Sequence, residues 1–131
     1  MPKPDAVVHV TEIVFPEHAN HYGTLFGGNA LLLMSKAAFL AARSHTGTDV
    51  VMASCSDAQF IAPVPMGSVL RLSAWVSRVG RSSLTVCVSG SAQALGADAA
   101  TVLKALFEMV AIDADGRPTP LPTAYLSTET A

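Results

Sequence analysis

Residues 18–28, HANHYGTLFGG, are polar and rich in glycine, and the stretch NALLLMSKAAFLAARSH follows them directly over residues 29–45. Ala, Leu and Met dominate the second stretch, and all three favour helix. Arg43 and His45 stand where basic residues complement the C-terminus of a helix, and Gly47 is a common stop signal. The two stretches together predict a loop that leads into a helix over about 29–45.

The predicted helix carries apolar residues nearly all round. Its polar exceptions, Asn29, Lys36 and Arg43, recur every seven residues on one narrow stripe. This pattern predicts a helix that is buried on most sides, at the centre of a domain. In the loop over 16–28, three glycines are expected to permit unusual backbone angles: Gly23, Gly27 and Gly28.

The remaining sequence predicts strands. Apolar and polar residues alternate over 68–79 and again over 82–94, and a Gly-Arg turn joins the two segments. β-Branched residues indicate further strands over 7–14 and 50–61. Segment 100–113 also contains helix-favouring residues, but we assign it as a strand because it follows two clear strands of a meander. One buried helix and five strands predict an α+β architecture with an antiparallel sheet.

The composition excludes several classes of function. The chain has 131 residues, 14% of them charged, and a formal net charge of −2. This length predicts one domain, and so few charges favour a homo-oligomer that exposes less surface than a monomer. No basic patch stands out among eight Lys and Arg residues, so nucleic-acid binding is not expected. No apolar run is long enough for a membrane span or a secretory signal, so neither is expected.

Cysteine and histidine do not indicate a metal centre. Cys55 and Cys87 lack metal-ligand spacing and are expected to be reduced thiols in the core of a cytoplasmic protein. Zinc would need a tighter group of ligands than the four scattered histidines provide, namely His9, His18, His21 and His45.

Four motifs in register indicate a family. HANHYGTLFGG and the helix are followed by SDAQFIAPVPMGSVL, VSRVGRSSLTV and MVAIDADGRPTPLP, and this arrangement resembles the hotdog-fold acyl-CoA thioesterases of the cytosolic acyl-CoA hydrolase type. The resemblance runs from about residue 9 to residue 122. The residues that match the family pattern are Asn20, Gly23, Phe26, Gly27, Gly28, Asp57, Phe60, Pro63, Gly67, Gly80, Arg81, Ser82 and Ser83.

The resemblance implies a fold and an assembly. One hotdog domain over 1–131 would wrap a five-stranded antiparallel sheet around the central helix, with a Pro-rich C-terminal tail from about 114 that is expected to be extended or frayed. Two protomers would join their sheets edge to edge, with the active sites at the dimer interface, and dimers would pair into tetramers or hexamers. The substrate would be an acyl-CoA, hydrolysed without a metal or redox cofactor, and coenzyme A enters only as part of that substrate.

The glycine pair is the expected carbonyl site. Attack of water on a thioester builds negative charge on the carbonyl oxygen, and fixed donors must lie where that charge appears. The amides of Gly27 and Gly28 lie near the positive end of the predicted helix, and the resemblance implies an oxyanion role for one of them. The alternative is a glycine turn needed only to begin the helix. Asn20 either holds the water or carbonyl, or ties down its own loop.

Position 35 departs from the family pattern. Relatives carry an Asp or Glu seven residues after the second glycine, where this chain has Ser35, and a neutral hydroxyl cannot take a proton without a base of its own. Another carboxylate could act instead, with Asp57 favoured over Glu17; Asp57 stands in a strand of small and apolar residues, where an acid needs a partner. Ser35 could be a nucleophile with a histidine of the partner chain. The site could also bind acyl-CoA without efficient hydrolysis. Cys55 stands where some relatives have a water-orienting Ser.

The two ends of the substrate are expected at different segments. Turn amides, hydroxyls and guanidinium groups can receive the phosphates of coenzyme A, although the same segment could be an ordinary hairpin turn. The expected coenzyme A residues are Arg78, Gly80, Arg81, Ser82 and Ser83. The expected acyl pocket consists of Phe26, Leu32 and Phe60, with Phe39 as a further candidate, and each of these could instead be a core residue.

We therefore interpret the chain as an acyl-CoA thioesterase, with a non-catalytic acyl-CoA-binding protein as the alternative. A dehydratase of the same superfamily ranks third, because His21 is the only residue near enough to be its catalytic histidine. A carboxylate facing the carbonyl site opposite Gly27 and Gly28 would favour the enzyme over the binding protein.

Overall fold

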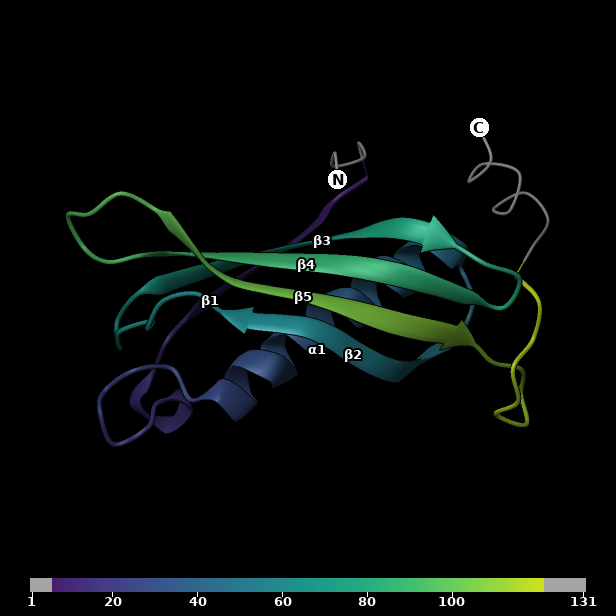
Figure 1. Cartoon of the computed structure of the whole chain (residues 1–131), viewed down its shortest axis with the longest axis horizontal. Helices are drawn as coiled ribbons and strands as arrows, with labels where there is room; N and C mark the ends of the chain where they lie inside the picture. Colours follow the sequence, from purple (N-terminus) through teal and green to yellow (C-terminus); the bar gives the residue numbers. More distant parts are fainter. Residues whose placement is uncertain (1–5, 122–131) are drawn as a thin grey trace.

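One long helix packs against one face of a five-stranded antiparallel sheet (Figure 1). The computed structural model describes residues 6–121. The strands lie in the order β1-β3-β4-β5-β2, and α1 contacts all five of them. The elements are β1 (Val8–Ile13), the short 3-10 helix η1 (Pro16–His18), α1 (Gly27–Thr46), β2 (Val50–Phe60), β3 (Val69–Val79), β4 (Ser83–Gln93) and β5 (Ala100–Ala111). The expected α+β fold is confirmed, including the strand assignment of the ambiguous fifth segment.

The core lies between α1 and the helix-facing side of the sheet. Small side chains on α1, such as Ala37 and Ala41, allow the helix to lie close to the strands. Leu72 of β3, Val86 of β4 and Phe107 of β5 are fully or almost fully buried beneath it. Alternate residues of these strands point away from the helix, as the period of two predicts.

Both ends of α1 have a local cause. The helix begins at Gly27, two residues earlier than predicted, so the glycine pair forms its first turn rather than the preceding loop. It ends where expected, because Gly47 adopts the left-handed conformation (φ 68°) and its N–H donates to the carbonyl of Arg43 at 2.8 Å.

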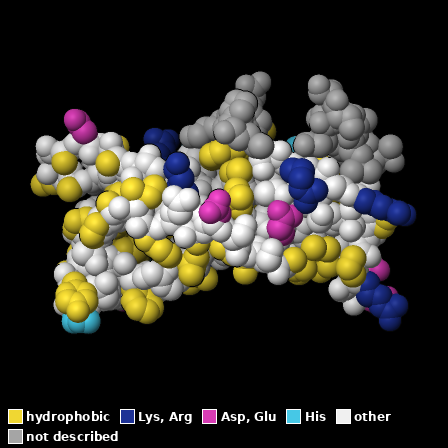
Figure 2. Space-filling view, in the orientation of Figure 1, with side chains coloured by type: hydrophobic (Ala, Val, Ile, Leu, Met, Phe, Trp, Pro, Cys, Tyr) yellow, Lys and Arg dark blue, Asp and Glu magenta, His cyan; other side chains and the backbone are white. Residues whose placement is uncertain are grey.

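The prediction that α1 is buried on most sides is wrong for the single chain. Only the face that carries Met34 and Ala38 is buried, and Leu32 on the far side is 51% exposed. Figure 2 shows apolar side chains along the border that β2 and α1 form, whereas charged side chains stand on the open sheet face. The large apolar residues exposed on these two elements and just after β2 are Leu31, Leu32, Leu40, Val51, Met52, Phe60 and Ile61.

The start of the C-terminal tail is ordered by backbone hydrogen bonds. The N–H of Thr119 donates to Ala111 at 2.9 Å, and that of Leu121 donates to Arg81 at 2.7 Å. Leu121 is buried. With the antiparallel bridge between Ile112 and Pro118, these bonds agree with the extended alternative of the prediction, not the frayed one, for the end of the described chain, and the rest of the predicted tail lies outside the described residues.

Candidate functional site

The side chain of Asn20 organises the loop before α1. Its Oδ1 accepts hydrogen bonds from the backbone N–H groups of Tyr22 (3.0 Å) and Thr24 (3.2 Å), and from the Thr24 hydroxyl. Gly23 completes the turn with a φ of 79°, which favours glycine. Asn20 thus ties down its own loop, the second of the two roles considered for it. Its Nδ2 group makes no hydrogen bond with the described residues, so two donors stay available.

A second asparagine, which the sequence indicated only as part of the polar stripe of the helix, fixes the loop to the helix. Asn29 Nδ2 donates to the carbonyl of His18 at 3.1 Å, and the Phe26 N–H donates to the same carbonyl at 2.9 Å. The end of the loop, at the start of α1, is therefore hydrogen-bonded to His18 at the beginning of the loop. This closure sets the direction in which the first amides of α1 point.

The glycine pair lies in ordinary helical backbone. Of the three loop glycines expected to adopt unusual angles, only Gly23 has a positive φ, so that prediction is wrong for Gly27 and Gly28. The first backbone bond of the helix runs from Ala30 N–H to Phe26 O at 2.9 Å, so the Gly27 and Gly28 amides precede the first intrahelical bond. Such amides, at the positive end of a helix, favour an oxygen that carries negative charge.

Each glycine lines its own cavity. Gly27 faces a cavity of about 320 Å³ whose other lining residues include Thr24 and Phe60. Gly28 faces a cavity of about 270 Å³ between α1 and β2, which Ser35 and Cys55 also line. The two cavities share no lining residue.

Two bulges in β2 decide which of its side chains reach the second cavity. Phe60 pairs with Leu103 and Cys55 with Phe107, and both partners are buried beneath α1. Phe60 and Cys55 are five residues apart, yet both lie on the helix-facing side, because the ladder shifts between Ser56 and Gln59. The ladder shifts again between Met52 and Ser54, and Met52 also lines the cavity of Gly28.

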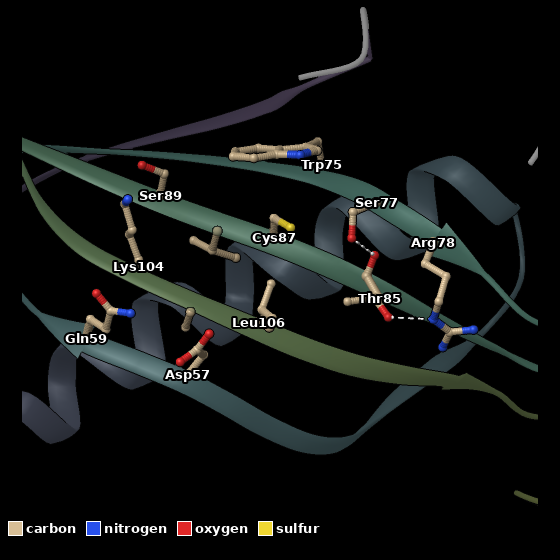
Figure 3. Close-up of a pocket in the computed structure, with 12 residues that line it drawn as sticks. Asp57, Gln59, Trp75, Ser77, Arg78, Thr85, Cys87, Ser89, Lys104 and Leu106 are labelled. Carbon is tan, nitrogen blue, oxygen red and sulfur yellow. Dashed lines mark hydrogen bonds between the residues drawn. The ribbon is translucent and has the colours of Figure 1, made fainter. Parts of the chain in front are cut away.

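Asp57 lies in the bulge between Ser56 and Gln59 and faces the side of the sheet that points away from α1. It is the only residue other than glycine with a positive φ (54°) between residues 6 and 121. Figure 3 shows its carboxylate with Gln59 and Lys104 on the sheet face that points away from α1, in a groove of about 680 Å³. The expectation that Asp57 is an enclosed acid with a partner is wrong for the described part of the chain, where it is exposed and makes no ion pair or hydrogen bond.

Ser35 and Cys55 approach the cavity of Gly28 from opposite sides, one on α1 and the other on β2. The Ser35 hydroxyl donates a hydrogen bond of 2.8 Å to the carbonyl of Leu32, one turn earlier. Cys55 is exposed to solvent in the single chain, but partial desolvation raises the pKa of its thiol. Within the described residues, neither glycine cavity is lined by a carboxylate.

Two further candidates lie apart from these cavities. His21 is exposed and packs its ring against that of Tyr22, with ring centroids 3.9 Å apart. Glu17 lies in the exposed 3-10 helix. Neither side chain lines the cavity of Gly27 or of Gly28, so the single chain does not place a catalytic histidine there.

The proposed coenzyme A residues divide into three groups: a paired arginine, an arginine that is unpaired within the described residues, and a hairpin turn. Arg78 is paired on the open sheet face, where its Nη2 lies 3.0 Å from Glu108 Oε2. Its Nε donates to the hydroxyl of Thr85 (Figure 3). Arg81 is exposed and has no side-chain partner among residues 6–121. The remaining three residues form the hairpin turn, in which Gly80 N–H donates to Ser83 O at 2.6 Å and Ser82 O accepts from Ala111 N–H.

The residues of the expected acyl pocket surround the first turns of α1 without forming one cavity. Phe60 lines the cavity of Gly27, and Leu32 lines the cavity of Gly28. The ring of Phe26 lies against Gly28, and Phe39 lines an adjoining apolar hollow further along the helix. Phe26, Leu32 and Phe60 are each about half exposed, so they are not core residues of the single chain.

No three His, Cys, Asp or Glu side chains within residues 6–121 gather where they could hold a metal ion. None of the helices in this part of the chain has the length and hydropathy needed to span a membrane.

Comparisons with known proteins give a consistent picture. Residues 22–95 match the family model described as thioesterase superfamily. An uncharacterized acyl-CoA thioester hydrolase of Zymomonas mobilis is 34% identical over 111 residues, which are 84% of this chain and 74% of that protein.

Solved structures match the fold closely. An acyl-CoA hydrolase from Agrobacterium tumefaciens has a TM-score of 0.83 and 37% identity; the match covers 92% of this chain but only 47% of that one, so this chain spans about half its length. An acyl-CoA hydrolase from Staphylococcus aureus, solved with butyryl coenzyme A, coenzyme A and coenzyme A disulfide, has a TM-score of 0.83 and 30% identity over 88% of this chain and 71% of that one. A hexameric acyl-CoA thioesterase has a TM-score of 0.85 and 32% identity over 88% of this chain and 75% of that one.

Proposed function

Because the chain belongs to the thioesterase superfamily, we propose that it hydrolyses the thioester bond of an acyl-CoA. Water adds to the carbonyl carbon, the C–S bond breaks, and coenzyme A leaves as a thiolate that takes up a proton released by the water. The products are a free acid and coenzyme A. No metal or redox cofactor takes part in this proposal.

The observation that carries the proposal is the glycine pair at the start of α1. Gly27 and Gly28 present amides that precede the first intrahelical hydrogen bond, and each lines a cavity. Neither needs to be glycine for its backbone angles, since neither has a positive φ. At Gly28 a side chain would meet the ring of Phe26 at 2.9 Å, but at Gly27 an added methyl would make only ordinary contact, so close approach of a substrate carbonyl accounts for the glycine at 27. The amides would stabilise the oxygen that becomes negative. The free Nδ2 donors of Asn20 would hold the water or the carbonyl from the loop.

We further propose a homodimer joined along β2. This strand is at one edge of the sheet, and all its residues after Val50 are exposed in the single chain. Long exposed edges of this kind pair with another strand. A second copy would also cover the apolar side chains of α1 and would close the cavities that Gly27 and Gly28 line. The hexameric assembly of a relative supports an oligomer, with three such dimers as one way to build it.

Formation of this dimer would not make Asp57 the general base. Sheets joined edge to edge continue one another, so Asp57 of both copies would stay on the face away from the helices. Glu17 of the same chain lines neither cavity. Hydrolysis would then rely on the amides and on Asn20, and it would lack the factor of about 10² to 10⁴ that a general base contributes.

A second candidate function is binding of acyl-CoA without efficient hydrolysis. Two observations favour this candidate. The Ser35 hydroxyl already donates its hydrogen to a backbone carbonyl, and no carboxylate of the described residues lines either glycine cavity to activate water. Release of free coenzyme A thiol from short, medium and long acyl-CoAs, measured beside equilibrium binding of the same compounds, separates the two. Turnover with multiple product molecules per site supports the enzyme. Tight binding with no release above the uncatalysed rate would leave only the binding protein.

A further inference from the structure

The hollow between α1 and β2 continues beyond the cavity of Gly28. A second apolar hollow of about 390 Å³ lies next to it, and both are lined by Ser35 and Met52. Together they form one groove, which we call the α1–β2 groove. It begins at the first turn of α1 and reaches Phe39 and Leu40 near its middle.

Lys36 is the only charged residue that lines the described α1–β2 groove. All other groove residues are apolar or carry a small hydroxyl or thiol. Lys36 is exposed in the single chain and forms neither an ion pair nor a hydrogen bond with residues 6–121. Two turns further along α1, by contrast, Arg43 has Asp49 at 4.0 Å. The groove therefore combines an apolar wall with one cation that has no counter-ion in its own chain.

We propose that the α1–β2 groove selects acyl chains with a carboxylate at the end remote from the thioester, and that Lys36 pairs with this carboxylate. The inference rests on the proposed thioester site, because it places the thioester carbonyl at Gly28. Eight residues separate Gly28 from Lys36, which is about 12 Å along a helix axis. The Lys36 side chain leans back toward the helix N-terminus, which shortens the span. A carboxyacyl chain of medium length, such as adipyl, fits this distance.

The chemistry of the groove favours this ligand over an uncharged acyl chain of equal length. A second copy joined along β2 would cover the groove and withdraw water from the Lys36 ammonium. An ammonium in such surroundings needs an anion nearby. The substrate carboxylate supplies it, and the methylene groups between the two ends of the substrate contact Met52 and Phe39.

The test compares adipyl-CoA with hexanoyl-CoA, which have equal numbers of acyl carbons and differ in one terminal carboxylate. Both kcat/KM for coenzyme A release and the equilibrium Kd are measured for wild type, Lys36→Met and Lys36→Glu. Lys104→Met is the matched control, because Lys104 lies in the groove on the opposite sheet face. Thermal unfolding of each variant confirms that it is folded.

We expect wild type to prefer adipyl-CoA by about tenfold to a hundredfold, the usual value of a charge-assisted hydrogen bond, mostly through KM and Kd. Lys36→Met abolishes the preference, Lys36→Glu reverses it, and Lys104→Met retains it. Equal or better use of hexanoyl-CoA by wild type, or a preference that survives in Lys36→Met, overturns the inference. If Kd shows the preference but no thioester is cleaved, the proposed hydrolysis fails and the specificity of the groove stands. If both thioesters are cleaved equally, the specificity alone fails.

Discussion

The Ser35 hydroxyl donates its hydrogen to the carbonyl of Leu32 at 2.8 Å, one turn earlier in α1. Hydroxyls of Ser in helices often bond back to the preceding turn in this way. The bond leaves Ser35 without a base that could remove its proton, because no carboxylate or histidine lines the cavity that it shares with Gly28 in residues 6–121. Ser35 therefore occupies the position where a catalytic carboxylate is expected, but its hydroxyl cannot accept a proton from water.

Ser35→Asp should increase turnover. The new carboxylate would stand at the wall of the cavity that Gly28 lines, where it could accept a proton from the attacking water. A general base contributes about 10² to 10⁴ in rate, so we expect a gain of at least about tenfold in kcat. Release of coenzyme A thiol measures it. Ser35→Asn, similar in size but uncharged, should show no gain, and Ser35→Ala should retain the wild-type rate. Loss of all activity in Ser35→Ala would instead identify Ser35 as a nucleophile.

Gly27→Ala should separate the catalytic role of the glycine from any structural role. A methyl group at this position would meet the ring of Phe60 at 3.9 Å, which is ordinary contact. Ala is also the better helix former by about 1 kcal/mol, so the free energy of unfolding should stay equal or rise. We nevertheless expect kcat/KM to fall at least about tenfold, because the methyl group would obstruct the approach of the carbonyl. Ser44→Ala, on an exposed part of the same helix, is the control. An unchanged kcat/KM in Gly27→Ala would show that the carbonyl does not enter the cavity of Gly27 and would leave the cavity of Gly28 as its site.

Substitutions of Asp57 should affect stability rather than turnover. Its φ of 54° lies in the left-handed region, which Asn and Gly tolerate and most residues do not. Asp57→Ala should therefore lower the free energy of unfolding by about 1 to 2 kcal/mol, and Asp57→Asn should keep it nearly constant. Chemical denaturation measures both. Asp57→Asn also removes the carboxylate, so a collapse of its coenzyme A release would restore Asp57 as the base and contradict the placement derived from the sheet faces.

Arg81 and Arg78 should differ in their effects on the nucleotide end of the substrate. Arg81 has no side-chain partner in the described part of the chain, whereas Arg78 is paired with Glu108 at 3.0 Å. Arg81→Met should weaken binding of coenzyme A and reduce the salt dependence of its Kd. Arg78→Met should lower stability by less than about 1 kcal/mol, because the pair is partly exposed, and should leave that Kd unchanged. Equal losses of affinity in both variants would show that the ion pair opens to admit a phosphate.

The fold could be predicted because its signals are local. The alternation of Leu70 and Leu72 with polar residues identified a strand, and Gly47 identified the end of α1. The exposed side of α1 could not be predicted, since apolar residues such as Leu32 suit a protein core and an oligomer interface equally. Leu32 is half exposed because the single chain supplies only one sheet face for the helix.

The site was harder to predict because β2 contains two bulges. A strict period of two places Phe60 and Cys55 on opposite faces, but in the bulge Asp57 and Ala58 stand opposite a single residue of β5, and this one extra residue brings Phe60 and Cys55 to the same face. The same bulge turns the carboxylate of Asp57 away from the glycine pair. Asp is enriched at positive φ, which was the one available signal in the sequence, although it does not by itself locate a bulge. Sequence could thus name the residues of the loop and of α1, but not the faces of β2.

Modification of Cys55 should test whether the cavity of Gly28 is the reacting site. Cys55 and Cys87 are the only two cysteines, and they lie on opposite faces of the sheet, so a Cys87→Ala background isolates the thiol in question. A bulky alkylating reagent on Cys55 should block both coenzyme A release and acyl-CoA binding, and prior addition of acyl-CoA should protect the thiol. Because desolvation raises its pKa, the reactive thiolate is scarcer at pH 7 than for a free cysteine. The alkylation rate should therefore rise with pH through a midpoint above that of glutathione, measured by intact mass. Complete labelling of Cys55 with no loss of binding or turnover would place the substrate elsewhere.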